Sequence, residues 1–309
     1  LRLAPEDLRR RVPRLANPIS EEAPYLRSSL LPGLLGAARR NRGRGIDDIA
    51  IWELGRVFLL REGQSPYGGV DPLRPGTAVR PSDDDLKALE DLLPDQPQHV
   101  AAVWSGRIEA QGWWGPGRSA TWADALEAAL HLVEAAGVDA DAVQGSDPSF
   151  HPGRTARIES AGVTLGYAGE LHPATCIAYG AAPRSVAFEL DLDVLAALSQ
   201  PARAPRFSVA PVAKEDIALV VHRDIPAAHV ASTLRAAVGD LVDDIRLFDV
   251  YEGSQVPDGT RSLAFAIRLR AADRTLTPEE IASAARSRMA NARAAMIAAA
   301  GSRHGATLR

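Results

Sequence analysis

Cysteine is almost absent from this chain of 309 residues, and so are the motifs that mark several common kinds of site. The single cysteine, Cys176, rules out an internal disulfide and a cysteine-rich zinc site, and it suits a reducing cytosol. No G-x-x-x-x-G-K-[ST] or G-x-G-x-x-G loop is present to cradle a phosphate, and no G-x-S-x-G motif supports a serine hydrolase. No apolar run approaches the length that crosses a bilayer, so we expect no membrane partner.

Neither the overall charge nor the histidines point to a ligand. The net charge is -4 and the isoelectric point is about 6.0, so any contact with RNA has to be local. The run RRNRGR at Arg39–Arg44 can contact phosphates, but it also suits a solvated helix end, where cations are favoured by the helix dipole. His151 and His172 each precede a proline and lack a third ligand nearby, so we assign no metal site.

Length and proline usage divide the chain into two expected domains. The stretch SQPARAPR at Ser199–Arg206 contains two prolines and is the natural linker. We therefore expect a first domain over residues 1–198, a linker over 199–206 and a second domain over 207–309. The first residue is not methionine, and we expect the chain to be part of a longer one.

The first domain has a mixed pattern of helices and strands. A serine cap at Ser28 or Ser29, with the leucines after it, predicts a helix toward Arg39. We expect strands over residues 49–60, 100–108 and 185–192, a helix over 122–137 and an exposed loop over 62–85. Trp113 and Trp114 suit either ligand stacking or packing, and we interpret them as packing in a core or an interface.

The second domain has a simple order of elements. Two apolar runs flank the turn Pro257-Asp258-Gly259, which is the strongest hairpin signal in the chain. We expect a strand over residues 216–221, a helix over 226–238, this hairpin over 244–270, a helix over 277–301 and an edge strand over 306–309. The order β-α-β-β-α-β is the ferredoxin-like plan of an α+β domain. RNA-recognition modules and amino-acid-sensing domains both use this plan, so the fold alone does not decide the function.

The two faces of the predicted hairpin differ. Because side chains alternate along a strand, we expect one face to be buried against helices. That face carries Phe248, Val250, Leu263, Phe265, Ile267 and Leu269. The other face carries Asp249, Tyr251 and Ser262 and is small and polar. It suits either a half-solvated sheet or the binding of a flat partner such as a nucleotide base.

Short motifs along the chain carry a resemblance to a known family. In the first domain they are NPISEE at Asn17–Glu22, LRSSLLPGL at Leu26–Leu34, ELGRVF at Glu53–Phe58, HPGR at His151–Arg154 and GELHP at Gly169–Pro173. In the second domain they are FDVY at Phe248–Tyr251, RSLAF at Arg261–Phe265, DRTLT at Asp273–Thr277 and the terminal LR at Leu308–Arg309. The chain resembles the C-terminal part of the beta subunit of the bacterial phenylalanine-tRNA ligase family, over nearly its whole length.

The resemblance implies a class II synthetase-like antiparallel sheet domain followed by a ferredoxin-fold anticodon-binding domain. The first domain, present in part, has lost catalysis and packs against the catalytic alpha subunit in an (αβ)2 tetramer. The glycine and arginine ATP motif of an active class II core is not visible around Gly166–Gly169. We therefore expect no catalytic residue, metal or cofactor in this chain, whereas ATP and Mg2+ serve the cytoplasmic holoenzyme that attaches phenylalanine to tRNA(Phe).

The resemblance also implies which residues contact the tRNA. The first anticodon base is recognised by a backbone group at Ala218, the carboxylate of Asp249 and the hydroxyl of Ser262. A carboxylate accepts the N–H donors on the Watson–Crick edge of guanine, and the bases of unpaired loops are accessible for such contacts. The arginines expected to hold the anticodon-stem phosphates are Arg261, Arg268, Arg270 and Arg274. The chain departs from the family at Glu215, where an arginine is usual.

Three other functions are compatible with parts of this pattern. An amino-acid-sensing module would bind phenylalanine instead of an anticodon stem-loop. A structural assembly subunit would bind neither ligand and would still associate with the alpha subunit. A standalone hydrolase has no nucleophile motif to support it.

Overall fold

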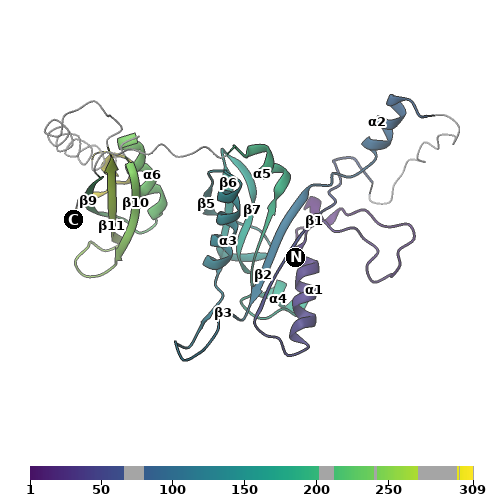
Figure 1. Cartoon of the computed structure of the whole chain (residues 1–309), viewed down its shortest axis with the longest axis horizontal. Coiled ribbons are helices and arrows are strands. Elements are labelled where there is room, and N and C mark those ends of the chain that lie inside the picture. The colour runs from purple at the N-terminus through teal and green to yellow at the C-terminus, as the bar shows by residue number, and fades with distance from the viewer. Residues whose placement is uncertain (66–79, 202–211, 240–241, 271–297, 299, 309) are drawn as a thin grey trace. The chain divides into compact units, whose positions relative to one another are not determined.

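The computed structural model describes residues 1–65, 80–201, 212–239, 242–270, 298 and 300–308. These residues belong to two compact units, Leu1–Ala202 and Arg203–Arg309 (Figure 1). The division between the units falls inside the range 199–206 predicted as a linker. Each unit contains its own sheet and its own buried core.

Six strands form one antiparallel sheet in the first unit, in the order β1-β2-β8-β7-β6-β5. They are β1 (Ile49–Arg56), β2 (Gln98–Ser105), β5 (Asp141–Gln144), β6 (Phe150–Ser160), β7 (Val163–Leu171) and β8 (Val186–Asp191). On β2 the residues from Val100 to Val103 are all buried, which requires both faces of the sheet to be covered. The predicted antiparallel sheet is confirmed.

Helices cover the two faces of this sheet. On one face are α1 (Leu31–Arg42) and α4 (Pro173–Tyr179), and on the other are α3 (Trp122–Ala135) and α5 (Leu192–Leu198). Alternate residues of β2 follow this division: Ala101 belongs to the core under α1, and Ala102 belongs to the core under α3. The helix predicted after Ser28 or Ser29 is confirmed as α1. The predicted serine cap is wrong, because the N-cap residue is Leu30 and makes no side-chain capping hydrogen bond; the Ser29 hydroxyl, one residue earlier, accepts from the Leu31 amide at 3.2 Å.

The loop predicted over residues 62–85 ends earlier than expected. Residues 66–79 lie outside the described part of the chain, and helix α2 (Asp83–Asp91) already begins at Asp83. Ser82 caps this helix: its hydroxyl accepts from the Asp85 amide at 3.1 Å, and the Asp85 carboxylate accepts from the Ser82 amide at 3.1 Å. This capping box was visible in the sequence as a serine followed three residues later by an acid.

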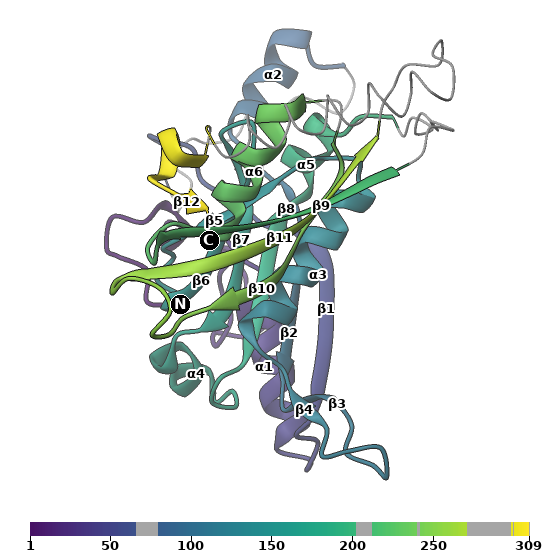
Figure 2. The ribbon, with the colours of Figure 1, turned by 90° about the vertical axis from the view of Figure 1, so that its left-hand side faces the viewer.

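Trp113 and Trp114 do not pack in a core, so that part of the prediction is wrong. They lie in the loop of a hairpin formed by β3 (Arg107–Glu109) and β4 (Arg118–Ser119) (Figure 2). They are 94% and 66% exposed, and their rings contact each other edge to face with centroids 5.8 Å apart. The pair is therefore available to a partner, which leaves the interface interpretation as a prediction.

The second unit has four antiparallel strands in the order β10-β11-β9-β12. They are β9 (Val212–His222), β10 (Val242–Tyr251), β11 (Thr260–Arg270) and β12 (Thr307–Leu308), with α6 (Ala227–Val238) between β9 and β10. Figure 2 shows β10, β11 and β9 side by side. This is the ferredoxin-like order that the sequence predicted. The helix predicted over 277–301 falls mostly outside the described residues.

One face of this sheet forms the core. Its buried residues are Ile217, Leu219, Val221, Leu263, Phe265, Ile267 and Leu269, and Val230 and Leu234 of α6 pack against them. The residues between these on β9 and β11 lie on the opposite, open face. Among the described helices of the chain, none combines the length and apolar character needed to cross a membrane.

The edge strand β10 departs from regular alternation. Its register against β11 shifts between Leu247 and Asp249, so Phe248 is an extra residue, as in a β-bulge. Val250 lies opposite Leu263 on the helix-covered side, as predicted, but the prediction that Phe248 and Val250 are buried is wrong, because they are 51% and 46% exposed. Phe248 belongs to the bulge, and Val250 has a neighbouring strand on one side only.

Candidate nucleic-acid interface

An exposed carboxylate and two alanines lie in a row on the open face of the second sheet. Asp249 on β10 is opposite Ala264 on β11, and Ala264 is opposite Ala218 on β9. Neighbouring strands lie about 4.8 Å apart, so the row spans roughly 10 Å. Asp249 is exposed and both alanines are partly exposed. The row forms a flat surface with a hydrogen-bond acceptor at one end.

Ser262 lies on the same face but is almost inaccessible. It is opposite Tyr251 on one side and Val220 on the other, and it is 2% exposed. The Cβ atoms of cross-strand neighbours are about 5 Å apart, so these two larger side chains flank the serine. Its hydroxyl therefore belongs to the floor of the open face, whereas the Asp249 carboxylate is accessible from above.

Two of the predicted phosphate contacts lie on the open face as well. Arg268 and Arg270 alternate along β11 with Ala264 and therefore share its face. Both contact the carboxylate of Asp243: Arg268 Nη2 lies 3.3 Å and Arg270 Nε lies 3.0 Å from it. The two cations are thus already engaged by a protein anion.

The other two predicted phosphate contacts are placed differently. Arg261 is opposite Val221 on the helix-covered side of the sheet, and its Nη2 donates to the backbone oxygen of Ile225 at 2.8 Å. That hydrogen bond joins β11 to the segment before α6. Arg274 lies outside the described residues.

Among the described residues, the open face has two further cations that were not predicted. Lys214 on β9 is exposed and lies opposite Arg268, and Arg246 on β10 is exposed and lies opposite Ala266. Alternation from Ala218 would have revealed Lys214. It would not have revealed Arg246, because the bulge interrupts the alternation between Arg246 and Asp249. Glu215, the departure from the family pattern, lies on the helix-covered side.

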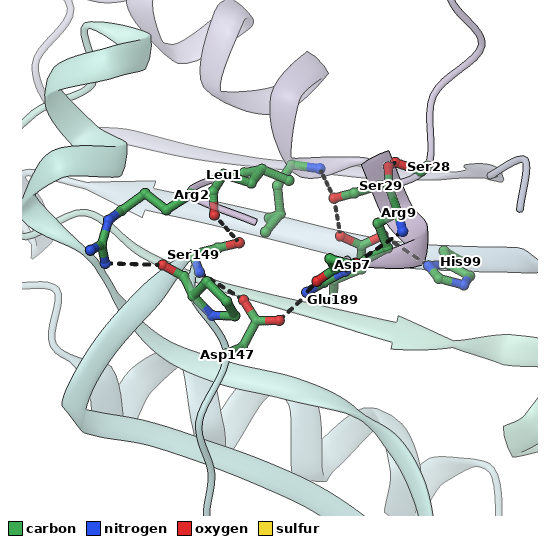
Figure 3. Close-up of polar contacts among 12 residues, drawn as sticks. Leu1, Arg2, Asp7, Arg9, Ser28, Ser29, His99, Asp147, Ser149 and Glu189 are labelled. Carbon is green, nitrogen blue, oxygen red and sulfur yellow. Dashed lines mark hydrogen bonds and ion pairs between the residues drawn. The ribbon is translucent and has the colours of Figure 1, made fainter. Parts of the chain in front are cut away.

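A partly buried polar cluster lies against the sheet of the first unit (Figure 3). Glu189 on β8 accepts hydrogen bonds from the Ser29 hydroxyl at 2.6 Å and the Leu30 amide at 3.1 Å, and His99 Nδ1 lies 2.8 Å from it. The Glu189 side chain is 14% exposed. Ser29 and His99 are 160 and 90 residues away from Glu189 in the sequence. No local pattern reveals such a cluster.

Arg9, in the short 3-10 helix η1 (Leu8–Arg10), extends the same cluster. It contacts Asp7 at 2.7 Å and Asp147 at 2.8 Å, and Asp147 also accepts from the Ser149 amide at 2.8 Å (Figure 3). The hydrogen bond from Arg9 lowers the pKa of Asp7. Burial by itself lowers the pKa of Arg9, but its hydrogen bonds to the two carboxylates outweigh burial and raise that pKa. The cluster lines a cleft of about 190 Å³.

The two His-Pro pairs have a local structural role. His151 Nδ1 accepts a hydrogen bond from the Gly153 amide at 3.1 Å, and His172 Nδ1 accepts one from the Ala174 amide at 3.0 Å. His172 thereby caps the N-terminus of α4. In the part of the chain that the structure describes, no group of three or more His, Cys, Asp or Glu side chains is arranged to hold a metal ion.

Comparison with protein families identifies both units. Residues 1–192 match the family model described as the phenylalanyl tRNA synthetase beta chain CLM domain, and residues 208–301 match the ferredoxin-fold anticodon binding domain. The first match covers more than half of the chain. The chain belongs to the phenylalanyl-tRNA synthetase beta chain family. The resemblance read from the sequence motifs is confirmed, and the open face is the candidate RNA interface of an anticodon-binding domain.

The chain is also similar to phenylalanine–tRNA ligase beta subunits from several organisms. It is 46% identical to that of Streptomyces avermitilis over 312 residues, which cover 99% of the chain and 36% of the relative. It is 44% identical to that of Thermobifida fusca, with 100% and 36% covered, and 43% identical to that of Nocardia farcinica, with 98% and 35% covered. The chain thus spans about a third of the length of these relatives.

Proposed function

We propose that the second unit recognises the first anticodon base of tRNA(Phe) on the open face of its sheet, with Asp249 as the main recognition residue. The observation that supports this most directly is the row of Asp249, Ala264 and Ala218. An exposed carboxylate there lies beside two of the smallest side chains, on a face that the α6 core leaves free. Larger residues at the alanine positions would fill the space that a base needs.

The chemistry of the row suits an unpaired guanine. The Watson–Crick edge of guanine presents N–H donors, and an ionised carboxylate is a pure acceptor. Proteins recognise RNA sequence mainly at unpaired loop bases, where this edge is free. In this proposal Ala218 contributes a backbone group, and the Ser262 hydroxyl supports the base from below because it lies in the floor of the face.

Cations further along the sheet suit the RNA backbone. Arg268 lies roughly 14 Å along β11 from Ala264, at about 3.4 Å per residue, and Lys214 lies opposite it. Arg270 and Arg246 lie on the same face. Phosphate contacts of this kind fix the orientation of the RNA without selecting its sequence. Arg261 is left out of this set because its guanidinium is bound to a backbone oxygen.

For the first unit we propose a different function, which is association with the alpha subunit in a cytosolic (αβ)2 tetramer. The exposed Trp113 and Trp114 suit such an interface, since aromatic residues are enriched there. The ligase family implies ATP and Mg2+, but the carboxylates of Glu189, which is partly buried, and Asp147, which is buried, already accept hydrogen bonds from protein groups. These residues do not fit a magnesium nucleotide. We therefore assign ester formation, with ATP and Mg2+, to the alpha subunit.

The test compares wild type with Asp249→Ala in the complete ligase, with Asp258→Ala in the hairpin turn as the control. Aminoacylation is measured with tRNA(Phe) and with transcripts altered at the first anticodon base. We expect Asp249→Ala to raise the KM for tRNA(Phe) and to lower kcat/KM. The fall in kcat/KM should correspond to a loss of about 1–3 kcal/mol of transition-state stabilisation, by analogy with base contacts in DNA. The preference between transcripts should disappear, and phenylalanine activation without tRNA should stay intact. Unchanged tRNA kinetics would remove Asp249 from the site.

A further inference from the structure

One carboxylate on the open face is shared by two arginines. The register of β10 against β11 shifts between Val242 and Asp244, so Asp243 is the extra residue of a second bulge. Its carboxylate lies 3.3 Å from Arg268 Nη2, 3.0 Å from Arg270 Nε and 3.5 Å from Arg270 Nη2. The three side chains are 26%, 47% and 28% exposed, in the order Asp243, Arg268, Arg270. The group is accessible to a ligand in solution.

We propose that Asp243 competes with the RNA backbone for Arg268 and Arg270, and so sets the affinity of the open face for RNA of any sequence. This inference depends on the proposed function only in naming RNA as the ligand of this face. The carboxylate occupies the Nε and Nη2 edge of Arg270, which is one of the two guanidinium edges that can hold a phosphate in a bidentate contact. A phosphate has to displace Asp243 or share the arginine with it.

The charges favour competition over assistance. A carboxylate that positions an arginine for a phosphate would leave the guanidinium edge facing the ligand open, but here the Nε and Nη2 atoms of one edge of Arg270 both lie against the carboxylate. Asp243 also brings a negative charge to within hydrogen-bond distance of the two groups that would hold a phosphate, and like charges repel. The cost falls equally on every RNA, because phosphate contacts carry no sequence information. Recognition then depends more on the base contact at Asp249.

The experiment measures binding of the complete ligase to tRNA(Phe) and to a transcript altered at the first anticodon base, at several salt concentrations. The variants are Asp243→Asn, Asp243→Ser, the double variant Arg268→Gln with Arg270→Gln, and this double variant combined with each Asp243 substitution. Asp258→Asn is the control, since it removes the same charge at the far end of the hairpin, roughly 30 Å along β11 from Arg268. Thermal unfolding of each variant shows whether the fold is kept, and Asp243→Ser replaces Asp243→Asn if the latter does not fold.

We expect Asp243→Asn to tighten binding of both RNAs by the same factor of about five, the equivalent of one favourable surface ion pair. The slope of log K against log salt should become steeper by up to about 0.7 for each phosphate gained. Without the two arginines, the Asp243 substitution should have no effect. Unchanged or weaker binding by Asp243→Asn would overturn the inference. Failure of the proposed function would give a different result. The wild-type ligase would then bind tRNA(Phe) and the altered transcript with the same affinity, whether or not the Asp243 substitutions change that affinity.

Discussion

Asp249 lies directly opposite Ala264, one position after the register shift that follows Leu247. The shift absorbs Phe248, so Arg246 before it and Asp249 after it lie on the same face of the sheet. In a regular strand an even-numbered and an odd-numbered residue face opposite sides. The bulge therefore lets one edge strand present both a cation and an acceptor to the same ligand.

Arg246 tests this effect of the bulge. We expect Arg246→Gln to weaken tRNA(Phe) binding by a similar factor for every anticodon sequence. The slope of log K against log salt should become shallower by the amount that corresponds to about one phosphate contact. The measurement is a binding titration of the complete ligase over a range of salt. Arg235→Gln is the matched control, because Arg235 is exposed in the last turn of α6, on the covered side of the sheet. Equal effects of the two substitutions would contradict a defined RNA face.

Ser262 and Asp249 are expected to differ in their effect on recognition. Ser262 is 2% exposed between Tyr251 and Val220, so its hydroxyl contributes less than the accessible carboxylate. We expect Ser262→Ala to lower kcat/KM for tRNA by a factor that corresponds to about 1 kcal/mol or less of transition-state stabilisation. This is the contribution of one neutral hydrogen bond. Aminoacylation kinetics of Ser262→Ala and Asp249→Ala, measured under the same conditions, show which substitution causes the larger loss of kcat/KM. A larger loss for Ser262→Ala than for Asp249→Ala would mean that the serine is the main recognition residue.

The two phenylalanines of the hairpin form a matched pair for stability. Phe265 is 1% exposed in the core under α6, and Phe248 is 51% exposed in the bulge. We expect Phe265→Ala to destabilise the second unit by about 3–5 kcal/mol, because it leaves a cavity. Phe248→Ala should cost about 1 kcal/mol or less. Hydrogen exchange of the β9 and β11 amides reports the stability of this unit, and similar losses for both variants would show that Phe248 is packed.

Asp124 should make the stability of α3 depend on pH. A hydrogen bond from Arg118 lowers its pKa, and Asp124 also accepts from the Thr121 amide at 2.7 Å in a capping box. The folded pKa lies below the unfolded value of about 3.9, so the stabilisation is present above that value and is lost as pH falls through the folded pKa. We expect Asp124→Ala to cost about 1 kcal/mol at pH 7.

The difference between wild type and Asp124→Ala should shrink as the pH falls below about 4. Denaturant unfolding from pH 7 to pH 2 measures it. Asp83→Ala is a suitable control, since the Asp83 side chain is 94% exposed and its contact with Arg80 is 3.5 Å long. A difference between wild type and Asp124→Ala that stays constant down to pH 2 would contradict the role of the ionised carboxylate.

The sequence by itself determined the family, the order of elements in the second unit and most of its buried face. These features depend on local patterns: turn residues, caps, motifs and the alternation of apolar residues on β9 and β11. The face of Ser262 and the helix after Ser29 were therefore predictable.

The tertiary structure alone decided the rest. Whether Phe248 and Asp243 are extra residues depends on how β10 pairs with β11, and the same pairing places Arg246 beside Asp249 on one face. The contacts of Glu189 join residues up to 160 positions apart. Local periodicity cannot reveal either feature, because a register shift and a contact between distant residues are both determined by the partner segment rather than by the segment itself.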